Sequence, residues 1–154
     1  MNTPIIGPLH TRLAVFVGTW AGEEIIHPNP WGPGGPAKGQ WRFGFDRSGF
    51  NLIHDFAEKR ADGTLFDAHG VLSVDPEPAE YVWFWFDSYG YPPLSPSRGN
   101  WDGNVLMLVK HTPRGISRSF FELSGDRFSY RIDNKLKGQE DFAPVMTGEF
   151  VRQS

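Results

Sequence analysis

The sequence predicts an all-β domain, a ten-stranded antiparallel up-and-down barrel with a short N-terminal helix plugging one end. Three observations support this fold class. The 154 residues divide into short apolar segments separated by turn residues. No helical segment of the length that a parallel crossover needs lies between them. An even number of strands lets the first and last strands pair antiparallel, which closes the sheet and removes its edges.

The individual elements follow from their punctuation. A helix of about two turns is expected over 9–16, directly after Gly7-Pro8. Gly, Asp and Ser mark tight turns at 47–49, 61–63, 102–103 and 124–126. The predicted strands are 17–27, 39–47, 50–60, 65–74, 80–87, 97–101, 104–111, 115–123, 127–134 and 142–152.

The connections of such a meander alternate between its two ends. The two long connections rich in Pro and Gly, 28–38 and 88–96, fall at the same end. Several tight turns and the N-terminal helix fall at the opposite end. Long loops on one rim of a barrel commonly surround a binding site, so we expect a mouth at this end. The alternative is that both loops serve only as surface connections.

Composition narrows the range of functions. The net charge is −3 and the 15 Lys and Arg residues are scattered, which disfavours a nucleic-acid partner. The chain has no Cys, which fits a reducing compartment. Neither a signal peptide nor the roughly 18–20 apolar residues of a membrane helix can be recognised. We therefore expect one soluble domain over 1–154, in the cytoplasm, with no membrane partner.

A motif opens the first predicted strand. Residues 16–22 read FVGTWAG, which places Gly-x-Trp directly after the helix. This resembles the opening of calycin-type barrels, the lipocalins and fatty-acid-binding proteins. In those families the Trp closes the barrel floor beside a basic residue of the last strand, and the resemblance gives these roles to Trp20 and Arg152. A guanidinium stacked on an indole stabilises such a closure by about 0.5–2 kcal/mol.

Further pieces extend the resemblance over most of the chain. The Gly-Thr-Trp start, the GNWDG segment at 99–103 and the closing aromatic-x-Arg resemble a family of small bacterial domains with this barrel. That resemblance implies a fold and no established chemistry. Nitrobindin-like haem barrels share the Gly-Thr-Trp-x-Gly opening and bind iron through a His near the C-terminus. The last His here is His111, so haem is the weakest alternative and no cofactor is expected.

Alternation assigns side chains to the two faces of each strand. The inner face combines many rings with a few polar groups, a lining that suits an apolar or aromatic small molecule. Loops 28–38 and 88–96 would close over it, with Trp31, Tyr89 and Tyr91 on the lid. The predicted ligand-binding residues are Trp41, Phe43, Phe56, Glu58, Trp83, Trp85 and Tyr130.

Strand 80–87 is apolar on both faces. We expect its tryptophans to point inward, which leaves Val82, Phe84 and Phe86 outside. A monomer rarely exposes such a patch. The patch is predicted to be covered by a second copy of the chain, in a homodimer through the outer face of 80–87, or by another segment of the same chain.

Glu24 and His54 are the candidate catalytic residues. They lie at similar heights on the inner face, one strand apart, so their backbones are on the order of 10 Å apart and the side chains could meet. A carboxylate–imidazole couple would satisfy both buried groups and would also resemble an acid/base pair. The other interpretation of His54 is a structural histidine. No metal site is predicted. The two main hypotheses are binding of an apolar or aromatic molecule, and a small-molecule lyase, isomerase or cyclase that uses Glu24 and His54.

Overall fold

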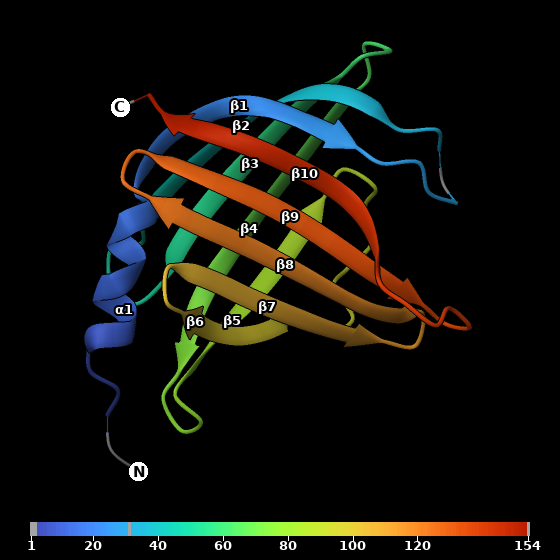
Figure 1. Ribbon diagram of the computed structural model, residues 1–154. Helices are drawn as coiled ribbons and strands as arrows, with labels where there is room; N and C mark the ends of the chain where they lie inside the picture. Colours follow the sequence, from blue (N-terminus) through green and yellow to red (C-terminus); the bar gives the residue numbers. More distant parts are fainter. Residues whose placement is uncertain (1–2, 31, 154) are drawn as a thin grey trace.

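A computed structural model describes residues 3–30 and 32–153. Ten antiparallel strands close into a barrel, and the N-terminal helix lies at one end (Figure 1). Each strand pairs with the one before it in the chain, and β1 pairs with β10. The predicted fold class is therefore confirmed. Within the described residues, no helix is long and apolar enough to cross a membrane.

The boundaries lie close to those that the turn residues predicted. The helical segment consists of α1 at Pro8–Arg12 and a 3-10 turn at Leu13–Phe16. The strands are β1 Gly18–Ile26, β2 Gly35–Phe45, β3 Leu52–Arg60, β4 Leu65–Asp75, β5 Glu80–Asp87, β6 Ser97–Asp102, β7 Val105–Thr112, β8 Gly115–Ser124, β9 Arg127–Leu136 and β10 Ala143–Arg152.

The start of β2 differs from the prediction of 39–47. Pro36, which we placed in the loop, is paired with Ile25 of β1, and its carbonyl oxygen accepts a hydrogen bond from the Ala61 N–H at 3.1 Å. A proline is tolerated at the beginning of a strand, where its missing N–H is not needed. The loop before β2 is correspondingly shorter than 28–38. Trp31, expected on the lid, lies outside the described residues.

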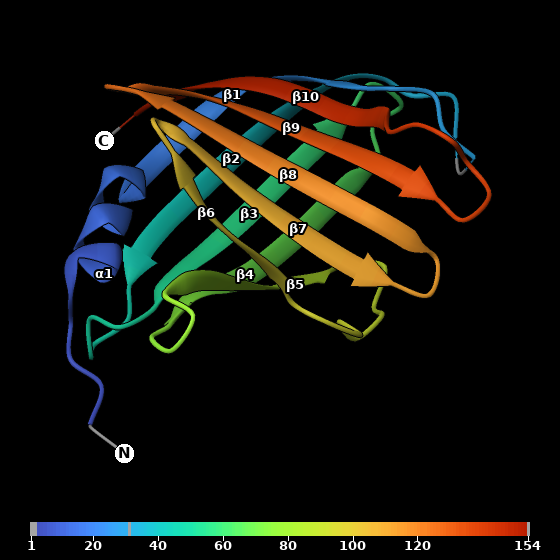
Figure 2. The ribbon, with the colours of Figure 1, turned by 60° about the horizontal axis from the view of Figure 1, so that its bottom comes forward.

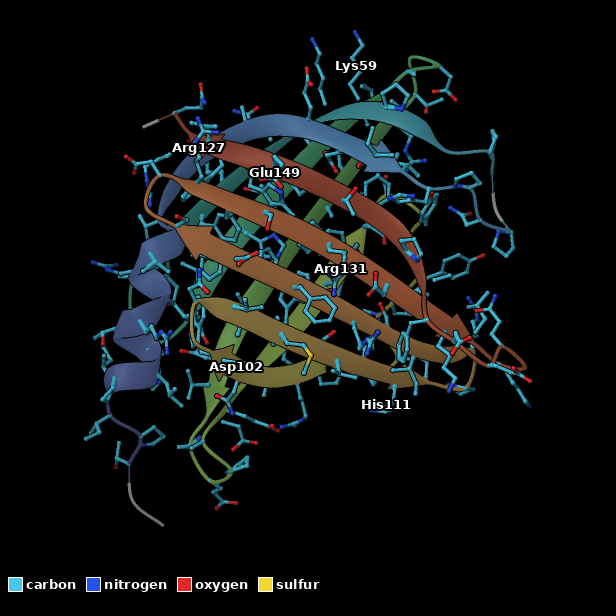
Figure 3. The ribbon with its side chains drawn as sticks, in the orientation of Figure 1. Lys59, Asp102, His111, Arg127, Arg131 and Glu149 are labelled. Atoms are coloured by element: carbon cyan, nitrogen blue, oxygen red, sulfur yellow. The ribbon has the colours of Figure 1, made fainter. Side chains whose placement is uncertain are left out.

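The predicted alternation of faces is present along β1, β2 and β3. Every second residue of β3 from Leu52 to Glu58 is buried, and the residues between them are exposed. Figure 3 labels Lys59, Arg131 and Glu149, three exposed residues of β3, β9 and β10 that belong to the outer set. The interior is consequently built from one side of each strand.

The floor of the barrel is closed as the calycin resemblance implies. Trp20 and Arg152 are register partners on β1 and β10, and the Arg152 guanidinium lies 4.1 Å from the Trp20 ring centroid. Arg152 also donates to the carbonyl oxygens of Val15, at 2.9 Å, and Val17. The Trp20 indole N–H donates to the Phe16 carbonyl at 2.7 Å. These bonds fasten the helical segment across this end of the barrel.

The sheet is least complete beside β5. β5 pairs with β4 along its full length but with β6 only from Tyr81 to Trp83, and Figure 2 shows β6 leaving β5. The loop between them spans this opening. The Ser88 hydroxyl oxygen accepts a hydrogen bond from the Asp67 N–H of β4, and the Ser95 hydroxyl donates one to the His111 carbonyl of β7. The end of β5 after Trp83 is therefore bordered by a loop instead of a strand.

The outer face of β5 is apolar, but less of it is exposed than predicted. Phe84 and Phe86 are 37% and 39% exposed, whereas Val82 is 7% exposed. Arg98 of β6 reaches across β5 to Asp75 of β4 at 3.3 Å, and its side chain passes over this end of the strand. The homodimer expected through this face stays a prediction.

The floor contacts predict that Arg152 cannot be replaced by another cation. Arg152→Lys keeps the charge but loses the planar fork that bonds two carbonyls while covering the indole. We expect the free energy of unfolding in urea to fall by about 1–3 kcal/mol. The control Arg47→Lys, in an exposed turn, should change it by less than about 0.5 kcal/mol. Equal values for both variants would contradict this role of Arg152.

Candidate functional site

Trp41 lies at the centre of the ring cluster inside the barrel. Its ring stacks on Phe43 at a centroid distance of 5.4 Å and lies 4.5 Å from Phe56. Tyr130 and His54 approach it in T-shaped geometry, at 5.2 Å and 5.3 Å. The rings predicted to bind a ligand are thus brought together inside the barrel, from β2, β3, β5 and β9. They are Trp41, Phe43, Phe56, Trp83 and Tyr130, all buried, and Trp85, which is half-buried.

His54 is held in one tautomer by Trp83. The Trp83 indole N–H donates to Nε2 of His54 at 2.8 Å, so Nε2 carries no proton. Burial lowers the pKa of His54 to about 3, and His69 on the neighbouring strand adds to the decrease. The ring is therefore neutral at pH 7, and its proton is on Nδ1. Nδ1 has no hydrogen-bond partner among the described groups.

A glycine of β4, the strand between those of His54 and Trp83, allows the hydrogen bond between these two residues. Gly70 of β4 is the register partner of His54 on β3 and of Trp85 on β5. A Cβ at Gly70 would lie 2.5 Å from Nε2 of His54. The missing side chain therefore lets the imidazole reach over β4 to an indole two strands away.

The Glu24 carboxyl reaches across β2 in the same way. A Cβ at Gly39 would lie 1.8 Å from its Oε1 atom, and a Cβ at Gly148 would also touch its side chain. Gly39 is the register partner of Glu58 on β3, so the two glutamates face each other over a glycine. Glu24 is 1% exposed and Glu58 is 4% exposed.

This carboxyl pair has one cation beside it. Arg60 donates to Glu58 at 2.8 Å and to the Tyr89 hydroxyl at 3.2 Å. Burial raises the pKa of Glu24 to about 9, and the charge of the adjacent Glu58 adds to the rise, against a smaller effect of Arg60. At pH 7, Glu24 is therefore a neutral acid, and Arg60 forms its ion pair with Glu58.

The structure does not join Glu24 and His54 as the sequence suggested. Glu24 faces Glu58, while His54 accepts a hydrogen bond from Trp83. Both residues are buried on the inner face, as expected. The couple does not form because each side chain extends over a glycine toward a different strand.

Other polar groups share this interior. Burial raises the pKa of the Tyr130 hydroxyl, which is hydrogen-bonded to Ser119. The indole Nε1 of Trp41 and both carboxyl oxygens of Glu24 have no geometric hydrogen-bond partner among the described groups. Arg60, Gly39 and Gly70 were not among the site residues predicted from the sequence. The glycines could have been noticed, because Gly39 and Gly70 interrupt inward positions that otherwise carry large side chains.

Two hollows that the structure contains lie outside this ring cluster. A groove of about 530 Å³ crosses the outer face of β2 to β5, and a smaller one of about 260 Å³ lies near the ends of β8 and β9. Within the described part of the chain, no group of three or more His, Asp or Glu side chains is placed to hold a metal ion. The larger groove is lined by Gln40, Arg42, Asp55, Phe56, Ala57, Asp67, Ala68, His69, Asp87 and Ser88.

Comparison with known proteins identifies the fold. No family model and no curated protein sequence matches the chain. Rv2717c from M. tuberculosis superposes with a TM-score of 0.75 at 18% identity, covering 97% of this chain and 100% of its own. The S-type phycobiliprotein lyase CPES from Guillardia theta has a TM-score of 0.68 at 10% identity, covering 94% and 92%. EF1p2_mFAP2b bound to DFHBI has a TM-score of 0.52 at 16% identity, covering 94% and 99%. These likenesses establish a shared barrel architecture.

The two shifted groups predict opposite effects of pH on stability. The folded state keeps the Glu24 proton up to about pH 9, whereas the unfolded chain releases it near 4.5. Stability therefore falls as pH rises between these values, by roughly 1 kcal/mol per pH unit. The folded state keeps His54 neutral down to about pH 3, whereas the unfolded chain protonates it near 6.5. Stability therefore also falls as pH drops below 6.5, and the two effects offset each other between about 4.5 and 6.5.

Glu24→Gln isolates the contribution of the carboxyl. From pH 6.5 to 9, the free energy of unfolding of the wild-type protein should fall, while that of the variant should stay nearly constant. Urea unfolding at several pH values measures both profiles. Glu149→Gln, on the exposed face of β10, should follow the wild type. Parallel profiles for the wild type and Glu24→Gln would contradict a buried, protonated Glu24.

Proposed function

We propose that the interior of the barrel binds a small aromatic or apolar molecule. The observation that carries this proposal is a set of unpartnered polar atoms on a wall of rings: Nε1 of Trp41, Nδ1 of His54 and the Glu24 carboxyl. Each of these residues is at most 1% exposed. Buried polar groups are nearly always hydrogen-bonded, and leaving one unpaired costs about 1–3 kcal/mol. A ligand among the rings would provide partners for them.

The route to these atoms is the end of the barrel that carries the long loop between β5 and β6. The inward residues there are less tightly enclosed than those at the floor, since Ile26, Phe66, Trp85 and Ile132 are only half-buried. The rim carries Tyr89, whose ring lies 5.2 Å from Phe66 and whose hydroxyl is tied to Arg60. Because rings fill the centre, binding must shift some of them.

A structural neighbour supports the general role. EF1p2_mFAP2b shares this barrel architecture and has been solved bound to DFHBI. A barrel of this shape can therefore hold a small molecule. The chemistry of the ligand has to be argued from this chain's own residues, because sequence identity to that neighbour is 16%.

Tryptophan fluorescence tests the proposal, because the rings of the interior include Trp41, Trp83 and Trp85. Titration with two uncharged compounds, N-phenyl-1-naphthylamine and dodecanol, should change the emission in a saturable way for at least one of them. Trp85→Leu should weaken binding several-fold, since Trp85 lines the inner face. The matched control is Phe86→Leu, the adjacent residue on the outer face, which should leave affinity unchanged.

Two results would contradict interior binding. One is the lack of a saturable change with both compounds. The other is an equal loss of affinity in Trp85→Leu and Phe86→Leu, which would place the compound on the outer surface of β5.

A second candidate is acid–base catalysis, favoured by the raised pKa of Glu24. A carboxyl with a raised pKa beside a second carboxyl is a common arrangement for an acid and a base. On this view Glu24, with a pKa of about 9, donates the proton, and Glu58 is the other carboxyl. His54 is less suited, because its pKa is about 3 and its Nε2 atom is engaged by Trp83. For any substrate that the wild-type protein converts, loss of conversion in Glu24→Gln with conversion kept in Trp83→Phe would support this candidate.

A further inference from the structure

We propose that the interior selects ligands whose polar group is a hydrogen-bond acceptor, such as an aromatic ketone, and rejects the corresponding ammonium ions. This inference rests on the proposed function, because it concerns the molecule bound at that same wall of rings. It depends on which buried atoms carry a proton and which charges are already neutralised.

His54 presents a hydrogen-bond donor, and no acceptor, to a ligand. A neutral imidazole has one donor and one acceptor nitrogen. The acceptor, Nε2, is already used by the Trp83 N–H at 2.8 Å. The nitrogen left for a ligand is therefore the donor, Nδ1–H, which has no partner among the described groups. Trp83 thus determines that His54 can donate a hydrogen bond to a ligand but cannot accept one from it.

Trp41 provides a second hydrogen-bond donor. An indole nitrogen can only donate, and Nε1 of Trp41 is buried and unpartnered. The ring centroids of Trp41 and His54 are 5.3 Å apart. Two donors without acceptors are thus carried by neighbouring rings on the wall that we propose for the ligand. A carbonyl oxygen, with two lone pairs, suits such a site.

The buried carboxyls leave no partner for a cationic ligand in the interior. Glu58 is bonded to Arg60 at 2.8 Å, and burial beside Glu58 keeps Glu24 protonated at pH 7. The described interior groups thus offer no unpaired carboxylate for an ammonium ion. Burying an ammonium group without a partner carries a large desolvation cost. An amine ligand would have to lose its proton or stay outside.

Three ligands of one shape test this selectivity: 2-acetylnaphthalene, 2-ethylnaphthalene and 1-(2-naphthyl)ethylammonium. They present an acceptor, no polar group and a charged donor on the same ring. Calorimetric titration at pH 7 should give an affinity about tenfold higher for the ketone than for the hydrocarbon. The ammonium ion should bind at least about 100-fold more weakly than the ketone.

Variants identify the donors. Trp41→Phe should remove most of the preference for the ketone over the hydrocarbon. Trp83→Phe should reduce it too, because His54 is then free to adopt the other tautomer. Phe56→Leu is the control: it changes a ring beside Trp41 without removing a donor, so both affinities should fall while their ratio stays the same. Long-range ¹⁵N–¹H spectra give a second readout, in which His54 of the unliganded wild type should be protonated at Nδ1.

The outcomes separate this inference from the function on which it rests. Equal binding of the ketone and the hydrocarbon would overturn the acceptor preference and leave interior binding intact. Binding of none of the three would remove both. A His54 protonated at Nε2, or a ketone preference unchanged in both Trp41→Phe and Trp83→Phe, would overturn the assignment of the donors.

Discussion

The pairing of β1 with β10 is the constraint on which the structure depends, because it closes the sheet and separates an interior from solvent. Trp20 and Arg152 seal this seam at the floor, where the guanidinium covers the indole and bonds the carbonyls of the helical segment. One residue thereby joins the last strand, the first strand and the helix. Most side chains on the inner side of the strands are then removed from water, polar ones included.

Because the barrel is closed, the partners and protonation states of its buried polar groups indicate what the interior can bind. Two of them, Glu24 and His54, extend across an intervening strand at a glycine, toward Glu58 and Trp83 respectively. Burial keeps the glutamate protonated and the imidazole neutral at pH 7, so the interior contains few full charges. What remains beyond these contacts is a set of donors on aromatic walls. The preference for an uncharged ligand with an acceptor follows from the same desolvation that shifts both pKa values.

Much of this could be predicted from the sequence, because strand alternation and turn chemistry are local. The inward positions of Trp41, His54 and Glu58, and the Trp20–Arg152 closure, followed from these patterns and from the calycin resemblance. The partners of Glu24 and His54 did not. Which inward side chains meet depends on the stagger of the strands around the barrel, which alternation alone does not define. The decisive positions carry glycine, and its role is to leave space for a side chain of another strand.

The central claim, that the interior binds a molecule through its unpartnered donors, is tested most directly by a crystal structure of the protein with 2-acetylnaphthalene. The account predicts that the ring lies among the aromatic side chains of the barrel, with its carbonyl oxygen within hydrogen-bond distance of Nε1 of Trp41 or Nδ1 of His54. A compound found in the outer groove across β2 to β5, with the interior rings unchanged, would contradict it.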